Sequence, residues 1–307
     1  MKKILVATQK PFAATAIENM VKMAEDKGYK VERLEKYAEQ ADFVKAVADA
    51  DAIIIRSDVA DKAVIDAAKN LKVIVRAGAG YDNIDLAACT ANGVVAMNTP
   101  GQNSNAVAEL AFGMMLYIVR NQFNGKAGSE LKGKKLGIHA YGNVGRNLAR
   151  IAKGFEMEVH AFDPFVPADK MQAEGIIPEA SAEEMYSKCD FISLHMPATE
   201  QTKKSINYNL MNLMPKGAVL INTARKEVID EDGLLQIMDA RQDFRYISDI
   251  APDCAHVFAE KFDGRYFFTP KKMGAQTEEA NINAGYAAVN QIIDFFETGN
   301  KRFQVNK

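Results

Sequence analysis

The chain has 307 residues, of which 48% are hydrophobic and 25% charged, so it is long enough for two domains that each bury a core. Its formal net charge of −2 argues against a general nucleic-acid-binding protein, which usually carries a basic surface. No apolar run approaches the ~20 residues of a membrane-spanning helix. A strand is predicted from Ile4, which leaves no room for a charged-then-apolar leader, and we therefore expect a cytoplasmic protein.

The three cysteines, Cys89, Cys189 and Cys254, lie far apart and form no CxxC pair. Their odd number and wide spacing are typical of reduced thiols in a cytoplasmic protein. We therefore expect no disulfide framework and no metal site.

Residues 1–97 alternate short apolar strands with amphipathic helices. This alternation predicts a parallel sheet covered on both faces, in which ligands bind beyond the carboxyl ends of the strands. The predicted strands are Ile4–Ala7, Val31–Leu34, Ala52–Arg56, Val73–Arg76 and Val94–Met97, and the predicted helices are Phe12–Lys27, Gln40–Ala48, Lys62–Lys69 and Leu86–Asn92.

Two of these strands end in arginine. Arg56 is followed by Ser57, and Arg76 by the open-backbone sequence AGAGYDN. Each arginine alone is compatible with a solvated strand end. Two at corresponding places favour an anion site, because a planar guanidinium suits a carboxylate or a phosphate better than an ammonium does.

A polar stretch at residues 98–105, NTPGQNSN, indicates the first crossing between domains. The next run, AVAELAFGMMLYIVRNQF at residues 106–123, is apolar nearly all round. A helix of that kind is buried. We interpret it as domain packing together with a homodimer contact.

Residues 134–164 carry a strand, a glycine turn, a helix and a second strand, Glu158–Phe162, that ends in Asp163. This order is typical of a dinucleotide-binding unit, in which Gly142 admits a pyrophosphate and Gly145 allows close helix–strand packing. Ala140 occupies the place of the usual first glycine, which is acceptable if its φ is negative. Asp163 favours NAD over NADP, because it can accept hydrogen bonds from a ribose diol and repels a 2′-phosphate. The alternative is a βαβ unit whose glycines serve packing alone.

The alternation then resumes as far as a last long helix. The predicted elements are the helix Ala182–Lys188, strand Asp190–His195, helix Tyr208–Leu213, strand Ala218–Ile221, helix Glu231–Ala240, strands Tyr246–Ser248 and Tyr266–Phe268, helix Glu278–Glu297 and a closing strand Phe303–Val305. Because the last helix is long enough to return to the first domain, we predict an α/β protein with two Rossmann-like, doubly wound parallel-sheet domains. Residues 1–98 and 281–307 form a flavodoxin-like substrate domain, residues 99–280 an NAD-binding Rossmann domain, and an interdomain cleft excludes water.

Six blocks, in order over nearly the whole chain, resemble those of the D-2-hydroxyacid dehydrogenase family. They are RAGAGYDNID (Arg76–Asp85), NTPGQNSNAVAEL (Asn98–Leu110), the nucleotide turn, DFISLHMPAT (Asp190–Thr199), MPKGAVLINTARKEVIDEDGL (Met214–Leu234) and TPKKMGAQTEEA (Thr269–Ala280). Within the family the sequence is most similar to short phosphoglycerate dehydrogenases. The resemblance implies NAD-dependent oxidation of 3-phospho-D-glycerate to 3-phosphohydroxypyruvate, the first step of serine biosynthesis.

The resemblance also implies roles for single residues. Arg225 would clamp the substrate carboxylate and the oxygen that becomes a carbonyl, as suits a bidentate cation. The matching substrate residues are Arg56, Ser57, Arg76 and Asn103. The matching cofactor residues are Gly142, Asn143, Val144, Gly145, Asp163, His195, Thr223, Ala224, Asp249 and Gly274.

The sequence departs from the family pattern at the acid–base pair. Lys271 and Lys272 follow Thr-Pro where a histidine is usual, and Cys254, with Asp253 beside it, holds the usual glutamate position. We hypothesise that a lysine replaces the pair, because burial and the nearby Arg225 would lower its pKa. The block between Thr-Pro and Gly-Ala is one residue longer than in the family pattern, so the position of the histidine can be aligned in two ways. Alignment from Gly274-Ala275 favours Lys272, and alignment from Pro270 indicates Lys271. We do not assign His195 as a base, since it matches the cofactor wall, and whether Asp253 replaces the glutamate stays open.

Two other functions are compatible with the sequence. The first is a dehydrogenase or reductase for another 2-hydroxy acid, such as glycerate or hydroxypyruvate. The paired Arg56 and Arg76 favour a doubly anionic substrate over it. The second is an inactive NAD-sensing scaffold, which the loss of the histidine and glutamate supports and the retained Arg225 opposes.

Overall fold

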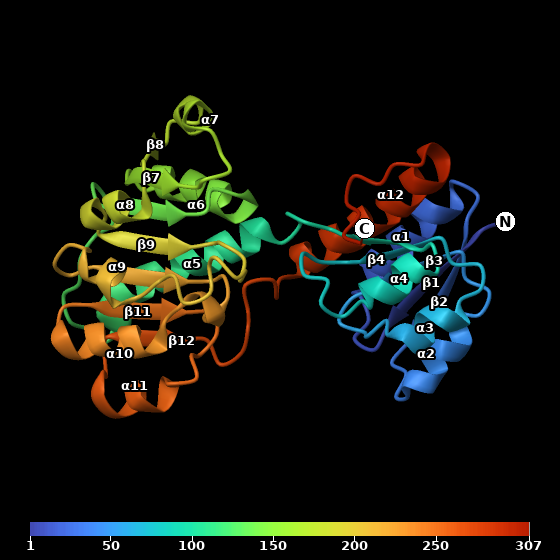
Figure 1. The fold of residues 1–307 in the computed structure, drawn as a ribbon, viewed down its shortest axis with the longest axis horizontal. Coiled ribbons are helices and arrows are strands. Elements are labelled where there is room, and N and C mark those ends of the chain that lie inside the picture. Colours follow the sequence, from blue (N-terminus) through green and yellow to red (C-terminus); the bar gives the residue numbers. More distant parts are fainter. Residues whose placement is uncertain (307) are drawn as a thin grey trace. The chain divides into compact units, whose positions relative to one another are not determined.

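The computed structural model describes residues 1–306, and the chain divides into two compact units (Figure 1). The first contains Met1–Asn103 and the residues from Thr277 onward, and the second contains Ser104–Gln276. The predicted boundaries, 98/99 and 280/281, lie a few residues from these. Thr99 belongs with the first unit because its N–H donates to the Gly78 carbonyl, and Thr277 caps the last helix by accepting from the Ala280 N–H.

The first unit contains a five-stranded parallel sheet within the described residues, in the order β2-β1-β3-β4-β5. This order is the flavodoxin-like one that the sequence predicted. The strands are β1 (Lys3–Thr8), β2 (Lys30–Glu35), β3 (Ala52–Ile55), β4 (Val73–Arg76) and β5 (Val95–Asn98), and the helices are α1 (Ala14–Glu25), α2 (Gln40–Ala46), α3 (Lys62–Ala67), α4 (Leu86–Ala91) and α12 (Glu278–Thr298).

Alternate side chains of β1 enter different cores, as expected for a sheet covered on both faces. Ile4 and Val6 pack in a cluster with residues of α1 and α12. Leu5 and Ala7 pack on the opposite face with residues of α2, α3 and α4. The first unit is therefore doubly wound.

The closing strand predicted at Phe303–Val305 is wrong. Gln304 makes only an isolated antiparallel bridge to Met97. The segment is held by the Val305 N–H, which donates to the Ala96 carbonyl at 2.8 Å, and by the Asn306 side chain. That side chain accepts from the Ala96 N–H at 2.8 Å and donates to the Val94 carbonyl at 2.9 Å.

The second unit contains a seven-stranded parallel sheet within the described residues, in the order β12-β11-β10-β9-β6-β7-β8. From β8 to β11 the strands follow the Rossmann order, and β12 extends the sheet beyond β11. The order reverses between β6 and β9, where ligands bind at the carboxyl ends of the strands in such sheets. The strands are β6 (Lys135–His139), β7 (Glu158–Phe162), β8 (Ile177–Pro178), β9 (Phe191–Leu194), β10 (Val219–Asn222), β11 (Arg245–Ser248) and β12 (Tyr266–Phe268).

Helices cover both faces of this sheet. One core cluster joins α5 and α6, and another joins α8, α9, α10 and α11. The elements α7, β8 and α11 were not predicted. The helices and short 3₁₀ turns are α5 (Ser104–Val119), η1 (Asn121–Phe123), α6 (Asn143–Gly154), α7 (Ala168–Ala173), α8 (Ala182–Lys188), α9 (Tyr208–Asn212), η2 (Lys226–Val228), α10 (Glu231–Ala240) and α11 (Ala255–Lys261).

Among residues 1–306, no helix is both long enough and apolar enough to cross a membrane. Over the same range, no group of three or more His, Cys, Asp or Glu side chains is arranged to hold a metal ion.

Candidate active site

The turn between β6 and α6 joins a strand to a helix through Gly142, with Ala140 at the place of the usual first glycine. Ala140 has a φ of +77°, so the negative φ under which an alanine is acceptable at this position is not present. Gly145 is buried, and an added Cβ there would lie 2.7 Å from the Ala140 carbonyl oxygen. The turn therefore needs glycine at 145 and tolerates strain at 140.

Gly142, Asn143 and Val144 lie at the amino-terminal end of α6, where the backbone N–H groups have no partner within the helix. An added Cβ at Gly142 would meet nothing within 4 Å, so the space above the turn is open. An anionic group can approach the helix end there.

The Asp163 carboxylate holds the turn from the end of β7. Its Oδ2 accepts from the Tyr141 N–H at 2.8 Å, and its Oδ1 accepts from the Phe165 N–H at 2.8 Å. A carboxylate has about four acceptor positions, so these bonds leave room for a ribose diol.

Sequence reasoning missed a cluster that supports this turn. The buried Tyr141 donates through its hydroxyl to Glu174 Oε2 at 2.9 Å. The Arg146 guanidinium lies 4.7 Å from the Tyr141 ring centroid and pairs with Glu174. A glutamate directly after the unpredicted helix α7 has no motif signal that could have identified it.

The strand β10 ends in a turn that presents Arg225. Asn222 Oδ1 accepts from the Ala224 N–H at 3.0 Å, and its Nδ2 donates to the Arg225 carbonyl at 3.0 Å. The Arg225 side chain is exposed and donates to the Ala224 carbonyl. The buried asparagine thus shapes the turn from which the arginine extends.

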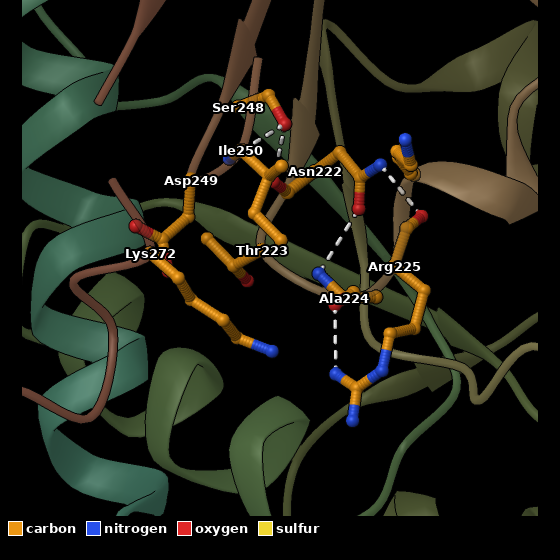
Figure 2. Close-up of a pocket in the computed structure, with 9 residues that line it drawn as sticks. Asn222, Thr223, Ala224, Arg225, Ser248, Asp249, Ile250 and Lys272 are labelled. Carbon is orange, nitrogen blue, oxygen red and sulfur yellow. Dashed lines mark hydrogen bonds between the residues drawn. The ribbon is translucent and has the colours of Figure 1, made fainter. Parts of the chain in front are cut away.

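A small pocket at the ends of β10 and β11 brings several of the predicted site residues together (Figure 2). In Figure 2 the side chains of Arg225 and Lys272 extend toward the same side of this pocket. Lys271 is not among its lining residues. These are Asn222, Thr223, Ala224, Arg225, Lys226, Ser248, Asp249, Ile250 and Lys272.

The loop that carries both lysines is fixed to Asp249, a buried residue at the end of β11. Asp249 Oδ1 accepts from the Thr269 hydroxyl at 3.0 Å and from the Met273 N–H at 2.7 Å, and Oδ2 accepts from the Gly274 N–H at 2.8 Å. Lys272 itself is exposed, so the unit that carries it does not provide the burial that we expected to lower its pKa.

His195, just beyond β9, is unsuited to the role of a base. Its Nε2 lies 2.9 Å from the Ser193 hydroxyl, and its Nδ1 lies 3.5 Å from the Thr223 hydroxyl. Burial, with a smaller effect from His139, lowers the pKa of His195 to about 3. The imidazole is therefore neutral near pH 7, and it lies outside the residues that line the Arg225 pocket.

In the first unit, the Arg56 guanidinium is mostly occupied by its own fold. Its Nη1 donates to the carbonyls of Lys10 and Pro11 at 2.9 and 3.0 Å, and its Nη2 donates to Asn281. The group also lies 5.0 Å from the Phe12 ring centroid. Three of its five N–H groups are thus committed, and Arg56 is not the open cation that the sequence predicted.

Arg76 is likewise engaged, since its Nε donates to the Arg56 carbonyl at 3.0 Å. Asn83, which the sequence analysis did not single out, donates to the same carbonyl and to that of Asp58, at 3.1 and 2.6 Å. The loop that carries the exposed Ser57 is therefore held from two sides. Asn103 is half-buried directly before α5.

Residues 114–254 match the NAD-binding domain of the D-isomer specific 2-hydroxyacid dehydrogenase family. The hydroxypyruvate reductase of Thermotoga maritima is 32% identical over 274 residues, which cover 84% of this chain and 88% of that protein. The chain belongs to the D-isomer specific 2-hydroxyacid dehydrogenase family. The NAD⁺-bound 3-phosphoglycerate dehydrogenase structure from Entamoeba histolytica is 47% identical, with a TM-score of 0.86 over 100% of this chain and 99% of that one.

The dehydrogenases of this family named for phosphoglycerate include longer proteins. D-3-phosphoglycerate dehydrogenase 2 of Arabidopsis thaliana is 41% identical over 214 residues, which are 65% of this chain and 34% of that protein. The human D-3-phosphoglycerate dehydrogenase is 31% identical over 89% of this chain and 54% of its own length. The chain thus spans about a third to a half of these relatives.

The family's cofactor is NAD, and the residues of the second unit fit it. The open space at Gly142 suits a pyrophosphate, and Asp163 keeps acceptor positions for a ribose. NAD, when bound, supplies the hydride acceptor.

At the position where the family pattern has a glutamate, this chain has the thiol of Cys254. Cys254 is buried, and burial raises its pKa to about 12. The neighbouring Asp253 pairs with Lys226 at 2.7 Å, and the backbone N–H groups of Asp253 and Cys254 donate to the Glu231 carboxylate. Because Asp253 is already paired, it is a poor replacement for the missing glutamate.

Proposed function

We propose that this protein oxidises 3-phospho-D-glycerate to 3-phosphohydroxypyruvate with NAD, the first step of serine biosynthesis. The observation that carries the proposal is that Arg225 and Lys272 line one pocket at the strand ends of the NAD-binding domain. The similarity to the Entamoeba histolytica 3-phosphoglycerate dehydrogenase over the whole chain supports it.

In this proposal Arg225 binds the substrate carboxylate and the oxygen that becomes a carbonyl, because a guanidinium offers two parallel N–H groups to each. Lys272 accepts the hydroxyl proton as a neutral amine, which the positive charge of Arg225 in the same pocket favours, while the hydride leaves the carbon that bears the hydroxyl. Lys271 is the weaker candidate for this role, since it does not line the pocket. Ser57, Arg76 and Asn103 complete the proposed substrate residues.

A second substrate class has an observation in its favour. The guanidinium of Arg56 is largely bound to backbone carbonyls and is therefore not an open receptor for a phosphate, and the Arg76 Nε binds the Arg56 carbonyl. An unphosphorylated acid such as glycerate or hydroxypyruvate needs one cation fewer. The Thermotoga maritima relative, named hydroxypyruvate reductase, is consistent with this alternative.

The deciding experiment follows NADH formation by absorbance with 3-phosphoglycerate, glycerate and lactate as substrates. We expect the highest kcat/KM with 3-phosphoglycerate. A preference for glycerate would move the assignment to the second class, and no turnover with any acid, together with measurable NAD binding, would favour an NAD-sensing scaffold.

The roles of the two lysines are separated by single alanine variants. Lys272→Ala should lower kcat by about 10²- to 10⁴-fold, the usual contribution of a general base. Lys271→Ala has the same change in charge and tests the neighbouring position, where we expect a loss of less than about threefold. The reverse result would move the role to Lys271, and normal rates in both variants would remove lysine from the mechanism.

We also infer that the protein is a cytoplasmic homodimer. The three cysteines are buried and free among the described residues, which suits a reducing compartment. Most of α5 is buried in its own unit, so a dimer contact needs further apolar surface. Phe123, at the end of the η1 turn that follows α5, is 67% exposed and offers it. Sedimentation of the wild type and of Phe123→Ser tests this: a monomeric wild type would contradict it.

A further inference from the structure

We propose that Asp249 is a positioning residue, which holds the loop Thr269–Gly274 so that Lys272 faces the Arg225 pocket. This inference rests on the proposed role of Lys272 as the proton acceptor. It differs from the role that family resemblance implies for Asp249, which is to hold the cofactor.

The contacts of Asp249 lie on both sides of the lysine pair. The Thr269 hydroxyl, 3.0 Å from Oδ1, precedes the lysines in sequence. The N–H groups of Met273 and Gly274, 2.7 and 2.8 Å from the two carboxylate oxygens, follow them. One buried carboxylate therefore fixes both ends of the segment that carries Lys271 and Lys272.

The carboxyl-terminal end of this loop is packed directly on the carboxylate. An added Cβ at Gly274 would lie 2.9 Å from Asp249 Oδ2 and 3.1 Å from Val107 Cγ2. The absence of a side chain at 274 thus permits the short hydrogen bond. Because Asp249 is 2% exposed, water does not compete for these three donors.

Most of the acceptor positions of Asp249 are taken by the loop. A carboxylate has about four acceptor positions, and three donors of the loop occupy three of them. Hydrogen bonds to a charged acceptor are about twice as strong as neutral ones, so removing the charge loosens the loop. A displacement of about 1 Å at an acid–base group costs about 100-fold in rate.

The test is a double-mutant cycle of Asp249→Asn and Lys272→Ala, with kcat, the KM for the acid substrate and the Kd for NAD measured in each variant. Asparagine keeps the size of the side chain but turns an amide N–H toward the loop donors. We expect Asp249→Asn to lower kcat by about 10- to 100-fold and to leave the Kd for NAD within about twofold. In the Lys272→Ala background, the same change should lower kcat by less than about twofold, because its effect passes through the lysine.

Thr269→Val provides a second, milder variant in case Asp249→Asn does not fold. It removes one donor to Oδ1 without changing the shape of the side chain, and we expect a smaller loss in kcat with the same dependence on Lys272. Asp263→Asn, an exposed aspartate of the same unit, is the matched control and should change none of the three constants.

Two outcomes would overturn the inference. A Kd for NAD that rises about tenfold in Asp249→Asn would assign the residue to the cofactor. An undiminished loss of kcat in the Lys272→Ala background would show that Asp249 does not act through the lysine. Failure of the proposed function itself is distinguished by Lys272→Ala alone, which would then keep normal activity.

Discussion

The Arg76 guanidinium lies over the backbone of Gly78, so that a Cβ added at Gly78 would fall 1.7 Å from Arg76 Nη1. Gly78 also has a φ of +154°, which L side chains rarely adopt. We predict that Gly78→Ala displaces the guanidinium, breaks the Arg76–Arg56 hydrogen bond and lowers the free energy of unfolding by about 2–3 kcal/mol. Urea unfolding of the full chain measures this loss.

Gly93→Ala is the control, because it introduces backbone strain at a positive φ without a steric contact for the added Cβ. Gly93 has a φ of +66° in the same unit, and an added Cβ would meet nothing within 4 Å. We expect it to cost about 1 kcal/mol. Equal losses in the two variants would show that the contact between Arg76 and Gly78 contributes nothing.

Ala140 has a left-handed φ of +77°, which costs an alanine about 1–2 kcal/mol. Ala140→Gly should relieve this strain. Glycine also increases the conformational entropy of the unfolded chain, which offsets part of the gain, so we expect the free energy of unfolding to rise by about 1 kcal/mol. Thermal unfolding checks the sign. Ala259→Gly, at an exposed position inside α11, should instead destabilise by about 1 kcal/mol. A destabilising Ala140→Gly would contradict the strain.

We predict that the protein loses stability in acid because the imidazoles of His139 and His195 are buried. Burial lowers the pKa of His195 to about 3 and that of His139 to about 4, from an ordinary value of 6.5. Between these values and pH 6.5 the unfolded chain binds more protons than the folded one, so stability rises with pH and is lost as pH falls. Each imidazole contributes up to about 1.4 kcal/mol per pH unit in this window.

The measurement is urea unfolding at pH values from 7 to 4.5. His195→Gln should reduce the slope of stability against pH relative to the wild type. His256→Gln, an exposed histidine of the same unit, provides the matched change in side chain. An unchanged slope in His195→Gln would show that this imidazole is not held neutral by the fold.

The Tyr141 hydroxyl should support NAD binding through the turn that it anchors. Tyr141→Phe removes the hydrogen bond to Glu174 and should cost about 1 kcal/mol of stability, with NAD bound up to about fivefold more weakly. Titration of NAD followed by fluorescence measures the second effect.

Tyr37→Phe makes the same chemical change in the first unit, where the hydroxyl donates to the buried Asp58 at 2.8 Å. It should lower stability and leave the affinity for NAD unchanged. An equal loss of NAD affinity in both variants would mean that the effect of Tyr141 is not local to the turn.

Elements with a strong local signal were predictable from the sequence. The helix α8 was predicted with its observed bounds, since Ser181 caps it by accepting from the Glu184 N–H. By contrast, α7 and α11 begin without a side-chain cap, and β8 is a two-residue strand too short for any periodicity. These three elements depend on pairing and packing with distant parts of the chain.

The candidate site was predictable in its residue types and less so in their bonding. The resemblance to the family indicated Arg225 and Lys272, and both line one pocket. The sequence could not show that the Arg56 guanidinium donates hydrogen bonds to Lys10, Pro11 and Asn281, because these partners come from segments far apart along the chain. Nor could it show the φ of Ala140, which depends on how the surrounding turn is held.

Helix α12 packs against α1, β3 and β4 of the first unit. All the strands of that unit are encoded before residue 104. During synthesis, the ribosome therefore completes the whole second unit before it makes the helix that closes the first core. Until then the face of the sheet that contains Ile4 and Val6 remains exposed and apolar. An exposed apolar face favours association with other nascent chains or with chaperones. The order of translation thus allows the second unit, Ser104–Gln276, to complete its fold before the first unit can.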